Sequence, residues 1–200
     1  MRPQGGEPPL ASADASDGVW LRALIRVAGA AGAVANFCDH MEHCEESDRA
    51  SVVAASGVLL EEADQIAASQ GLNLADRYQT RVAAIETRSP LHPIDGFDVC
   101  ARVAAATSWL DLQGVQARHD RLYHADVVGL HKQDQLRHCA LHLAKLVAAL
   151  ASALDSRTER ADFIDRRLAD LVIFSLKIAT LTGTKLGSDG LPNVPLYRPE

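Results

Sequence analysis

Two cysteines and two histidines crowd into one short stretch of the chain, as Cys38, His40, His43 and Cys44. Thiolate and imidazole groups are the ligands that zinc prefers, so this set raises the question of a zinc site. The spacing C-x-H-x-x-H-C matches no closed zinc pattern, and side chains at these offsets on a helix point in several directions. The alternative is a helix terminus, where a histidine near the negative end of the helix dipole is favourable. The sequence does not decide between a zinc site and a helix terminus at this position.

A second pair of histidines, His138 and His142, lies four residues apart, so both side chains fall on one face of a helix. Metal-binding histidines often have this spacing, but no glutamate follows His138 as in the H-E-x-x-H motif of metalloproteases. The other interpretation is a pair of buried histidines that are hydrogen-bonded to their neighbours. The sequence contains no glycine-rich phosphate loop, nucleophile elbow or dinucleotide fingerprint.

Adjacent acids, Glu61 and Glu62, lie inside an apolar stretch that favours a helix, with Asp64 close by. Carboxylate oxygens are the ligands that Mg²⁺ prefers, so these acids are candidates for a magnesium site. The alternative is an acidic face that lies in solvent and needs no metal.

The elements that must position these groups are helices. Alanine and leucine are abundant, aromatic residues make up only 4% of the chain, and no long segment alternates with a period of two. Apolar residues that recur every three or four positions predict about six helices, over residues 19–40, 47–70, 73–88, 97–123, 132–154 and 156–181. The fold class is therefore all-α, a helical bundle with short connections.

Prolines and glycines divide the chain into segments. Residues 1–17 predict a flexible N-terminal tail, and residues 187–200, with three prolines, predict an extended C-terminal tail. The sequence SPLHPIDG, residues 89–96, predicts a linker. It separates a first helical half, residues 18–88, from a second half, residues 97–186.

Charge and composition exclude several classes of protein. A formal charge of −6, from 20 basic and 26 acidic residues, disfavours a dedicated nucleic-acid binder. No apolar run approaches the ~20 residues that span a bilayer, and the first 18 residues lack the apolar core of a signal peptide. Four cysteines without an export signal indicate reduced thiols. We therefore expect a cytoplasmic protein with no membrane or nucleic-acid partner.

The C-terminal half carries a resemblance to a known family. Residues 167–186, RLADLVIFSLKIATLTGTKL, resemble a helix of the MazG-like, all-α nucleoside triphosphate pyrophosphohydrolases, with Asp170 in the aspartate position and Gly183 thirteen residues later. Residues 138–149, HCALHLAKLVAA, resemble the family's preceding helix in their apolar framework. The resemblance covers about a quarter of the chain. It implies a bundle that binds a nucleoside triphosphate and hydrolyses it with Mg²⁺.

The chain departs from this family at the metal ligands. The family holds Mg²⁺ with E-x-x-E on one helix and E-x-x-D on the next. These positions fall on His142 and Lys145, then on Arg167 and Asp170, so only Asp170 keeps an acid. One carboxylate cannot replace four around a hard cation. The resemblance therefore implies a weakly active or catalytically degenerate relative.

A shorter similarity to the same family covers residues 51–88, where the position equivalent to Asp170 is Val58. If both halves derive from one unit, the chain is a fused tandem pseudo-dimer. A homo-oligomer is also left open.

A competing alignment places residues 58–69, VLLEEADQIAAS, on the family's acidic helix. Glu61 and Glu62 then match its paired glutamates and, together with Asp165 and Asp170, predict a partial Mg²⁺ site across the two halves. Asp165 precedes Asp170 by five residues and lies roughly 140° away around the helix, which makes it a poor co-ligand. Alanine at Asp170 is expected either to abolish metal-dependent turnover or, if Asp170 is structural and paired with an arginine, to lower stability.

The second functional hypothesis belongs to a different class. It is a helical interaction or regulatory protein whose grooves bind a partner helix or a small ligand. Carboxylates that converge on one cavity favour the enzyme, whereas a groove lined by alanine and leucine favours the interaction protein.

Overall fold

A computed structural model describes residues 11–43, 46–88, 96–187 and 194–196. Within these ranges the chain forms nine helices and no strand, which confirms the all-α fold class. The helices are α1 (Ala11–Glu42), α2 (Arg49–Ser69), α3 (Leu74–Arg88), α4 (Val99–Ala104), α5 (Trp109–Tyr123), α6 (Ala125–Val128), α7 (Lys132–Asp155), α8 (Arg157–Arg166) and α9 (Leu168–Thr182).

The expected number of about six helices is too low, because two long helical patterns are interrupted and the short helix α6 forms in a segment where no helix was predicted. In the segment 97–123, α4 ends at Ala104 and Ser108 begins α5 by accepting a hydrogen bond from the Asp111 amide at 3.1 Å. In the segment 156–181, the chain bends at Arg167, which separates α8 from α9. Hydrophobic periodicity continues across both breaks, so the pattern alone does not reveal them.

The predicted segments differ from the structure at the ends of the chain. Helix α1 begins at Ala11, inside the stretch 1–17 that was expected to be a tail. Of the expected linker 89–96, residues 89–95 lie outside the described residues, as do 188–193 and 197–200 of the expected C-terminal tail.

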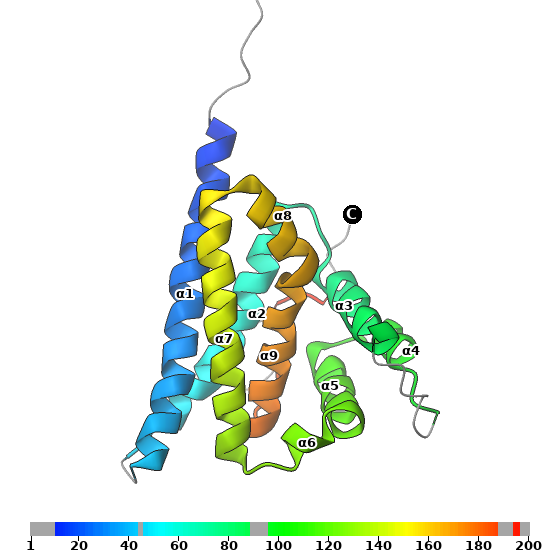
Figure 1. Cartoon of the computed structure of the whole chain (residues 1–200). Helices are drawn as coiled ribbons and strands as arrows, with labels where there is room; N and C mark the ends of the chain where they lie inside the picture. Colours follow the sequence, from blue (N-terminus) through cyan, green and yellow to red (C-terminus); the bar gives the residue numbers. More distant parts are fainter. Residues whose placement is uncertain (1–10, 44–45, 89–95, 188–193, 197–200) are drawn as a thin grey trace, which may run out of the picture.

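Four long helices form the centre of the molecule. Helix α1 packs against α2 and α7, and α9 packs against α2 and α7 (Figure 1). Nearly every residue of α9 is buried, as expected for a helix that is apolar on all sides. The Ser175 hydroxyl donates to the Ser56 carbonyl at 2.7 Å, which joins α9 to α2 through small side chains. The two halves of the sequence therefore contribute two helices each to one core.

Helices α3 and α5 pack against α9, and α4 packs against α3 and α5 on the side away from α9 (Figure 1). The short helix α6 follows α5. Two buried side chains of α5 hold the end of the described chain against this group. Trp109 donates from Nε1 to the Val194 carbonyl at 2.9 Å, and Gln113 donates from Nε2 to the Thr184 carbonyl at 2.7 Å. As a result α5 and α9 are fixed relative to one another, and they form two walls of the cavity described below.

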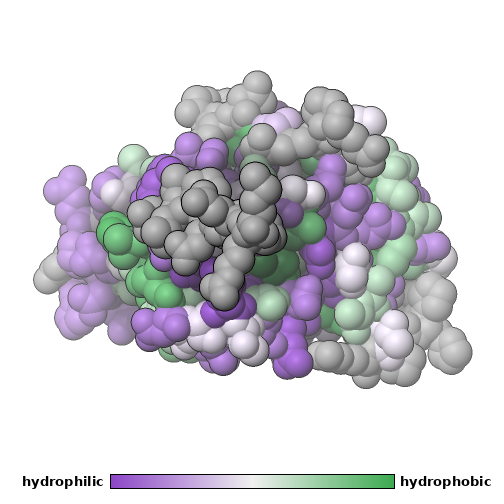
Figure 2. Space-filling model, turned by 90° about the horizontal axis from the view of Figure 1, so that it is seen from above, coloured by the Kyte–Doolittle hydropathy of each residue, from purple (hydrophilic) through white to green (hydrophobic). Residues whose placement is uncertain are grey.

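Two helices, residues 17–42 of α1 and 132–155 of α7, are long and apolar enough to cross a membrane by length and composition alone. This is weak evidence, because core helices of water-soluble proteins pass the same test. Both helices carry arginines that pair with acids on the bundle, Arg26 with Glu61 and Arg137 with Glu42. Seen from the α8 end, hydrophilic and apolar residues are interspersed on the coloured surface (Figure 2).

Candidate functional site

A cavity of about 360 Å³ opens between α3, α5, α6, α7 and α9. We call it the histidine cleft, because four of the eight histidines of the chain line it. Three cationic and two acidic side chains, an amide and a phenyl ring complete its polar and aromatic lining. The lining residues used below are Arg81, Gln116, His119, His124, Asp126, His138, His142, Arg167, Asp170, Phe174 and Lys177.

His119 is the most unusual side chain of the histidine cleft. It is only 2% exposed, and neither of its ring nitrogens has a hydrogen-bond partner among the residues that the structure describes. Its Nδ1 lies 3.8 Å from Oδ1 of Asp120, too far for a hydrogen bond. Buried polar groups are nearly always paired, so these two nitrogens indicate a partner other than the protein chain.

Asp120 is the centre of a buried polar network beside His119. Its Oδ1 accepts from Nε2 of Gln116 at 2.9 Å and contacts Nζ of Lys177 at 3.0 Å. The Tyr78 hydroxyl in turn donates to Oε1 of Gln116 at 2.7 Å. Burial opposes the charge on Asp120, but the polar neighbours outweigh it, so the pKa of this carboxyl lies below its ordinary value. Asp120 is therefore a carboxylate held in one orientation.

The opposite wall of the histidine cleft is formed by His138 and His142 on α7. The two rings lie 4.6 Å apart, and the His142 ring stacks on Phe174 at 4.8 Å. Burial, the neighbouring His138 and the nearby cations lower the pKa of His142 to about 4. Burial and lysine charges also lower the pKa of His138. Both imidazoles are therefore neutral near pH 7, the form that can accept a hydrogen bond or bind a metal.

The low pKa of His142 predicts a loss of stability in acid. Between pH 6.5 and 4 the unfolded chain binds a proton at this histidine that the folded chain resists, so the free energy of unfolding falls as the pH falls. We expect replacement of His142 by glutamine to reduce the loss between pH 7.5 and 5.5 by about 1 kcal/mol. Urea unfolding at both pH values measures this. The same change at the exposed His131 is the control, and equal effects of the two variants would disprove the prediction.

Of the four predicted magnesium ligands, Asp170 lines the histidine cleft. It is 7% exposed and accepts two hydrogen bonds from Arg81, from Nε at 2.7 Å and from Nη2 at 3.2 Å. Arg167 lies 3.7 Å from the same carboxylate. Asp165 instead lies at the surface, 69% exposed, where it pairs with Arg77 at 3.3 Å.

The predicted ligands on α2 face α1. Glu62 is completely buried, 2.9 Å from Nη1 of Arg26 and 3.6 Å from Nε of Arg22. Glu61 is partly exposed and pairs with the same Arg26 at 2.5 Å. All four predicted ligands are thus paired with arginines. Within the described residues they do not form a group of potential ligands whose oxygens approach one another.

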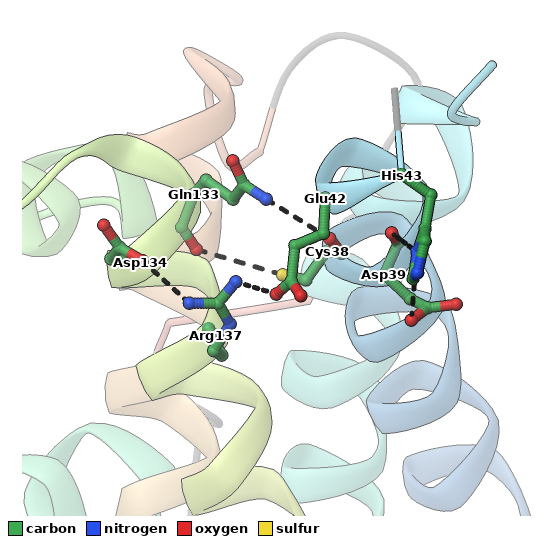
Figure 3. Close-up of polar contacts among 7 residues, drawn as sticks. All are labelled: Cys38, Asp39, Glu42, His43, Gln133, Asp134 and Arg137. Atoms are coloured by element: carbon green, nitrogen blue, oxygen red, sulfur yellow. Dashed lines mark hydrogen bonds and ion pairs between the residues drawn. The ribbon is translucent and has the colours of Figure 1, made fainter. Parts of the chain in front are cut away.

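Two members of the cysteine and histidine set at the end of α1, Cys38 and His43, lie on different sides of the helix (Figure 3). Cys38 is buried against α7, where its thiol faces the Gln133 carbonyl at 3.9 Å. His43 contacts the Asp39 carbonyl one turn earlier at 2.9 Å, and His40 contacts the Glu46 carbonyl at 3.1 Å. Cys44 lies outside the described residues. The described members of the set take part in helix-end contacts, as in the helix-terminus interpretation.

A group that sequence reasoning did not assemble is His119, Asp120 and His124. Within the described part of the chain, this is the one set of three histidine, cysteine or acidic residues whose ligand atoms all lie within 4.8 Å of one another. His119 and His124 are five residues apart across the end of α5, a separation that places no two side chains on one helix face. The adjacent His119 and Asp120 are two possible metal ligands that the sequence shows. That His124 lies close to them depends on the backbone turn between α5 and α6, which the sequence does not show.

Comparisons with models of protein families, with curated proteins and with solved structures found no significant match to this chain. The MazG-like assignment therefore stays a prediction from the residues.

Proposed function

We propose that this protein binds the phosphate groups of a nucleotide in the histidine cleft, as a degenerate relative of the MazG-like pyrophosphohydrolases. The observation that carries the proposal is a convergence of positions. Three of the four positions that the family alignment assigns to metal ligands, His142, Arg167 and Asp170, line the same cavity although they come from two helices and the bend between α8 and α9. Arg167 and Asp170 are three residues apart, and the packing of α7 against α9 brings His142 to them.

The side chains at these positions favour the phosphate groups over Mg²⁺. Arginine replaces a family acid at Arg167, and Arg81 and Lys177 are further cations of the cleft. Guanidinium groups bind phosphate oxygens in pairs, in a geometry that also orients the ligand. Asp170 holds Arg81 through two hydrogen bonds and so fixes one guanidinium at the cavity wall. The stacked rings of His142 and Phe174 supply an aromatic side for the base or the sugar.

Hydrolysis through the predicted magnesium ligands is not part of this proposal. The family holds Mg²⁺ with four acidic side chains, whereas Glu61, Glu62, Asp165 and Asp170 are each paired with arginine in this chain. We therefore expect a pyrophosphate-release screen with Mg²⁺ to give little or no turnover, while nucleotide binding is retained.

Replacing Arg167 with glutamine is expected to weaken nucleoside triphosphate binding about tenfold, because a charged hydrogen-bond donor to phosphate is lost. Isothermal titration with each of the common nucleoside triphosphates measures the change. Arg166 is the matched control, since it is the adjacent residue, is 73% exposed and pairs with Asp162. Adenosine, which carries no phosphate, is expected to bind weakly to all variants. Equal weakening by Arg166→Gln, or no triphosphate binding by the wild type, would refute the proposal.

A second candidate function is an interaction protein, and one observation favours it. Helices α1 and α7, which pack side by side, leave Leu21, Ile25 and Leu141 between 50% and 63% exposed. Apolar side chains on neighbouring helices are suited to a partner helix or a second copy of the chain. The molar mass in solution, measured by light scattering, separates a self-associating protein from a monomer.

A further inference from the structure

We propose that His119, Asp120 and His124 bind a divalent transition-metal ion, of the class of Zn²⁺, Mn²⁺, Fe²⁺ or Co²⁺, at the end of the histidine cleft where α5 meets α6. This inference goes beyond the proposed function and does not rest on it, because the site is tested with the metal ion alone.

The geometry requires only small movements. The three ligand atoms lie within 4.8 Å of one another. Ligands at about 2.0–2.2 Å from one metal are separated by roughly 3–4 Å, so a small rotation of the side chains is enough to close the site. His124 caps the end of α5 with non-helical dihedral angles and begins α6, which brings its ring within 5.7 Å of the His119 ring.

The second observation is that His119 is buried and unpaired among the described residues. A histidine that is 2% exposed loses its contacts with bulk water, yet both ring nitrogens lack a hydrogen-bond partner among the described residues. Leaving a polar group in this state costs stability unless a water molecule or an ion completes it. The ring lines the cleft, although its two nitrogens are buried, so a rotation of the side chain is needed to turn a nitrogen toward an ion there.

The surroundings resemble those of known metal ligands in proteins. Ligating carboxylates are themselves held by hydrogen bonds, which orient them and tune the metal. Gln116 and Lys177 both contact Oδ1 of Asp120, which is also the oxygen that lies 3.8 Å from Nδ1 of His119. Two imidazoles and one carboxylate leave further coordination positions open toward the cleft, which is typical of catalytic rather than structural sites. Imidazole nitrogen also selects transition metals over Mg²⁺.

The experiment is a titration of the chelator-treated, untagged full chain with Co²⁺, followed by the visible absorption of the bound ion. We expect one Co²⁺ per chain and displacement by Zn²⁺. His119→Leu and His124→Gln are each expected to weaken Co²⁺ binding more than tenfold, since even outer partners of metal ligands contribute 10–100-fold. Circular dichroism checks the fold of both variants. If the buried His119→Leu variant does not fold, His124→Gln decides, because His124 is only half-buried.

Two control variants locate the ion. His131→Gln changes an exposed histidine at the start of α7, and His43→Gln changes one at the end of α1. Neither is expected to alter Co²⁺ binding. A wild-type chain that binds no Co²⁺, or variants at His119 and His124 that bind it as tightly as the wild type, would overturn the proposal. Loss of binding in His43→Gln alone would place the ion at the end of α1 instead. The Co²⁺ titration uses no nucleotide, so its outcome does not depend on whether the chain binds nucleotides. The metal site and the proposed nucleotide binding can therefore be refuted independently.

Discussion

Replacing Asp170 with alanine is expected to lower the free energy of unfolding by about 3 kcal/mol. The carboxylate is 7% exposed and accepts two hydrogen bonds from Arg81, whose side chain is 22% exposed. Its removal leaves a largely buried guanidinium without its principal partner at the junction of α3 and α9. Breaking one side of a buried ion pair typically costs 3–5 kcal/mol, and the partial exposure of Arg81 places this pair at the lower end.

Urea unfolding at pH 7 measures this loss, and Asp165→Ala is the matched control. Asp165 also pairs with an arginine, but it is 69% exposed, so its replacement is expected to change the free energy of unfolding by less than about 0.5 kcal/mol. A stable Asp170→Ala variant would instead agree with an aspartate kept for a metal ion rather than for Arg81. Arg81→Met combined with Asp170→Ala is expected to restore part of the loss, because no charge is then left unpaired.

Replacing Glu62 with methionine is expected to have the opposite effect and to raise the free energy of unfolding by about 2 kcal/mol. Glu62 is completely buried, and burial raises its pKa despite the nearby guanidinium groups of Arg26 and Arg22. A raised pKa in the folded state means that ionisation at neutral pH costs stability. Methionine has a similar size without the charge. Replacement of a whole buried ion pair by apolar side chains of similar volume is often stabilising by about 1–4 kcal/mol, and here the buried member of the pair is the one that is replaced.

The arginines that lose Glu62 are not left in an apolar environment. Arg22 is 47% exposed, and Arg26 is 38% exposed and keeps its contact with Glu61 at 2.5 Å. The gain is expected to be larger at pH 7 than at pH 5, because the unfavourable ionisation of Glu62 is reduced as the pH falls toward its raised pKa. Chemical unfolding of the wild type and variant at both pH values measures this. Glu61→Met, at the partly exposed neighbour, is expected to give no gain. A Glu62→Met variant less stable than the wild type would contradict the argument.

The sequence by itself determined the fold class and the composition of the core. Apolar residues at spacings of three and four in residues 132–154 predict a helix that corresponds to α7, because side-chain periodicity and helix geometry are properties of the local chain. The pattern over residues 156–181 predicts one helix, which the structure divides into α8 and α9. Trp20 is fully buried against Phe163. Burial of large apolar groups is favourable in any compact arrangement, so such residues are identified without knowledge of the arrangement.

The partners of charged side chains were decided only by the tertiary structure. Asp170 meets Arg81, a residue 89 positions away, and no local pattern specifies which arginine a carboxylate contacts. The sequence therefore grouped Glu61, Glu62, Asp165 and Asp170 by their type, whereas the fold distributed them among arginines on different helices. The histidine cleft was likewise decided only by the tertiary structure. His119 and His124 come together because the backbone turns between α5 and α6. His138 and His142 face them because α7 and α5 both pack against α9. Ion pairs and cavities depend on distances between elements, and those distances are set when the helices pack.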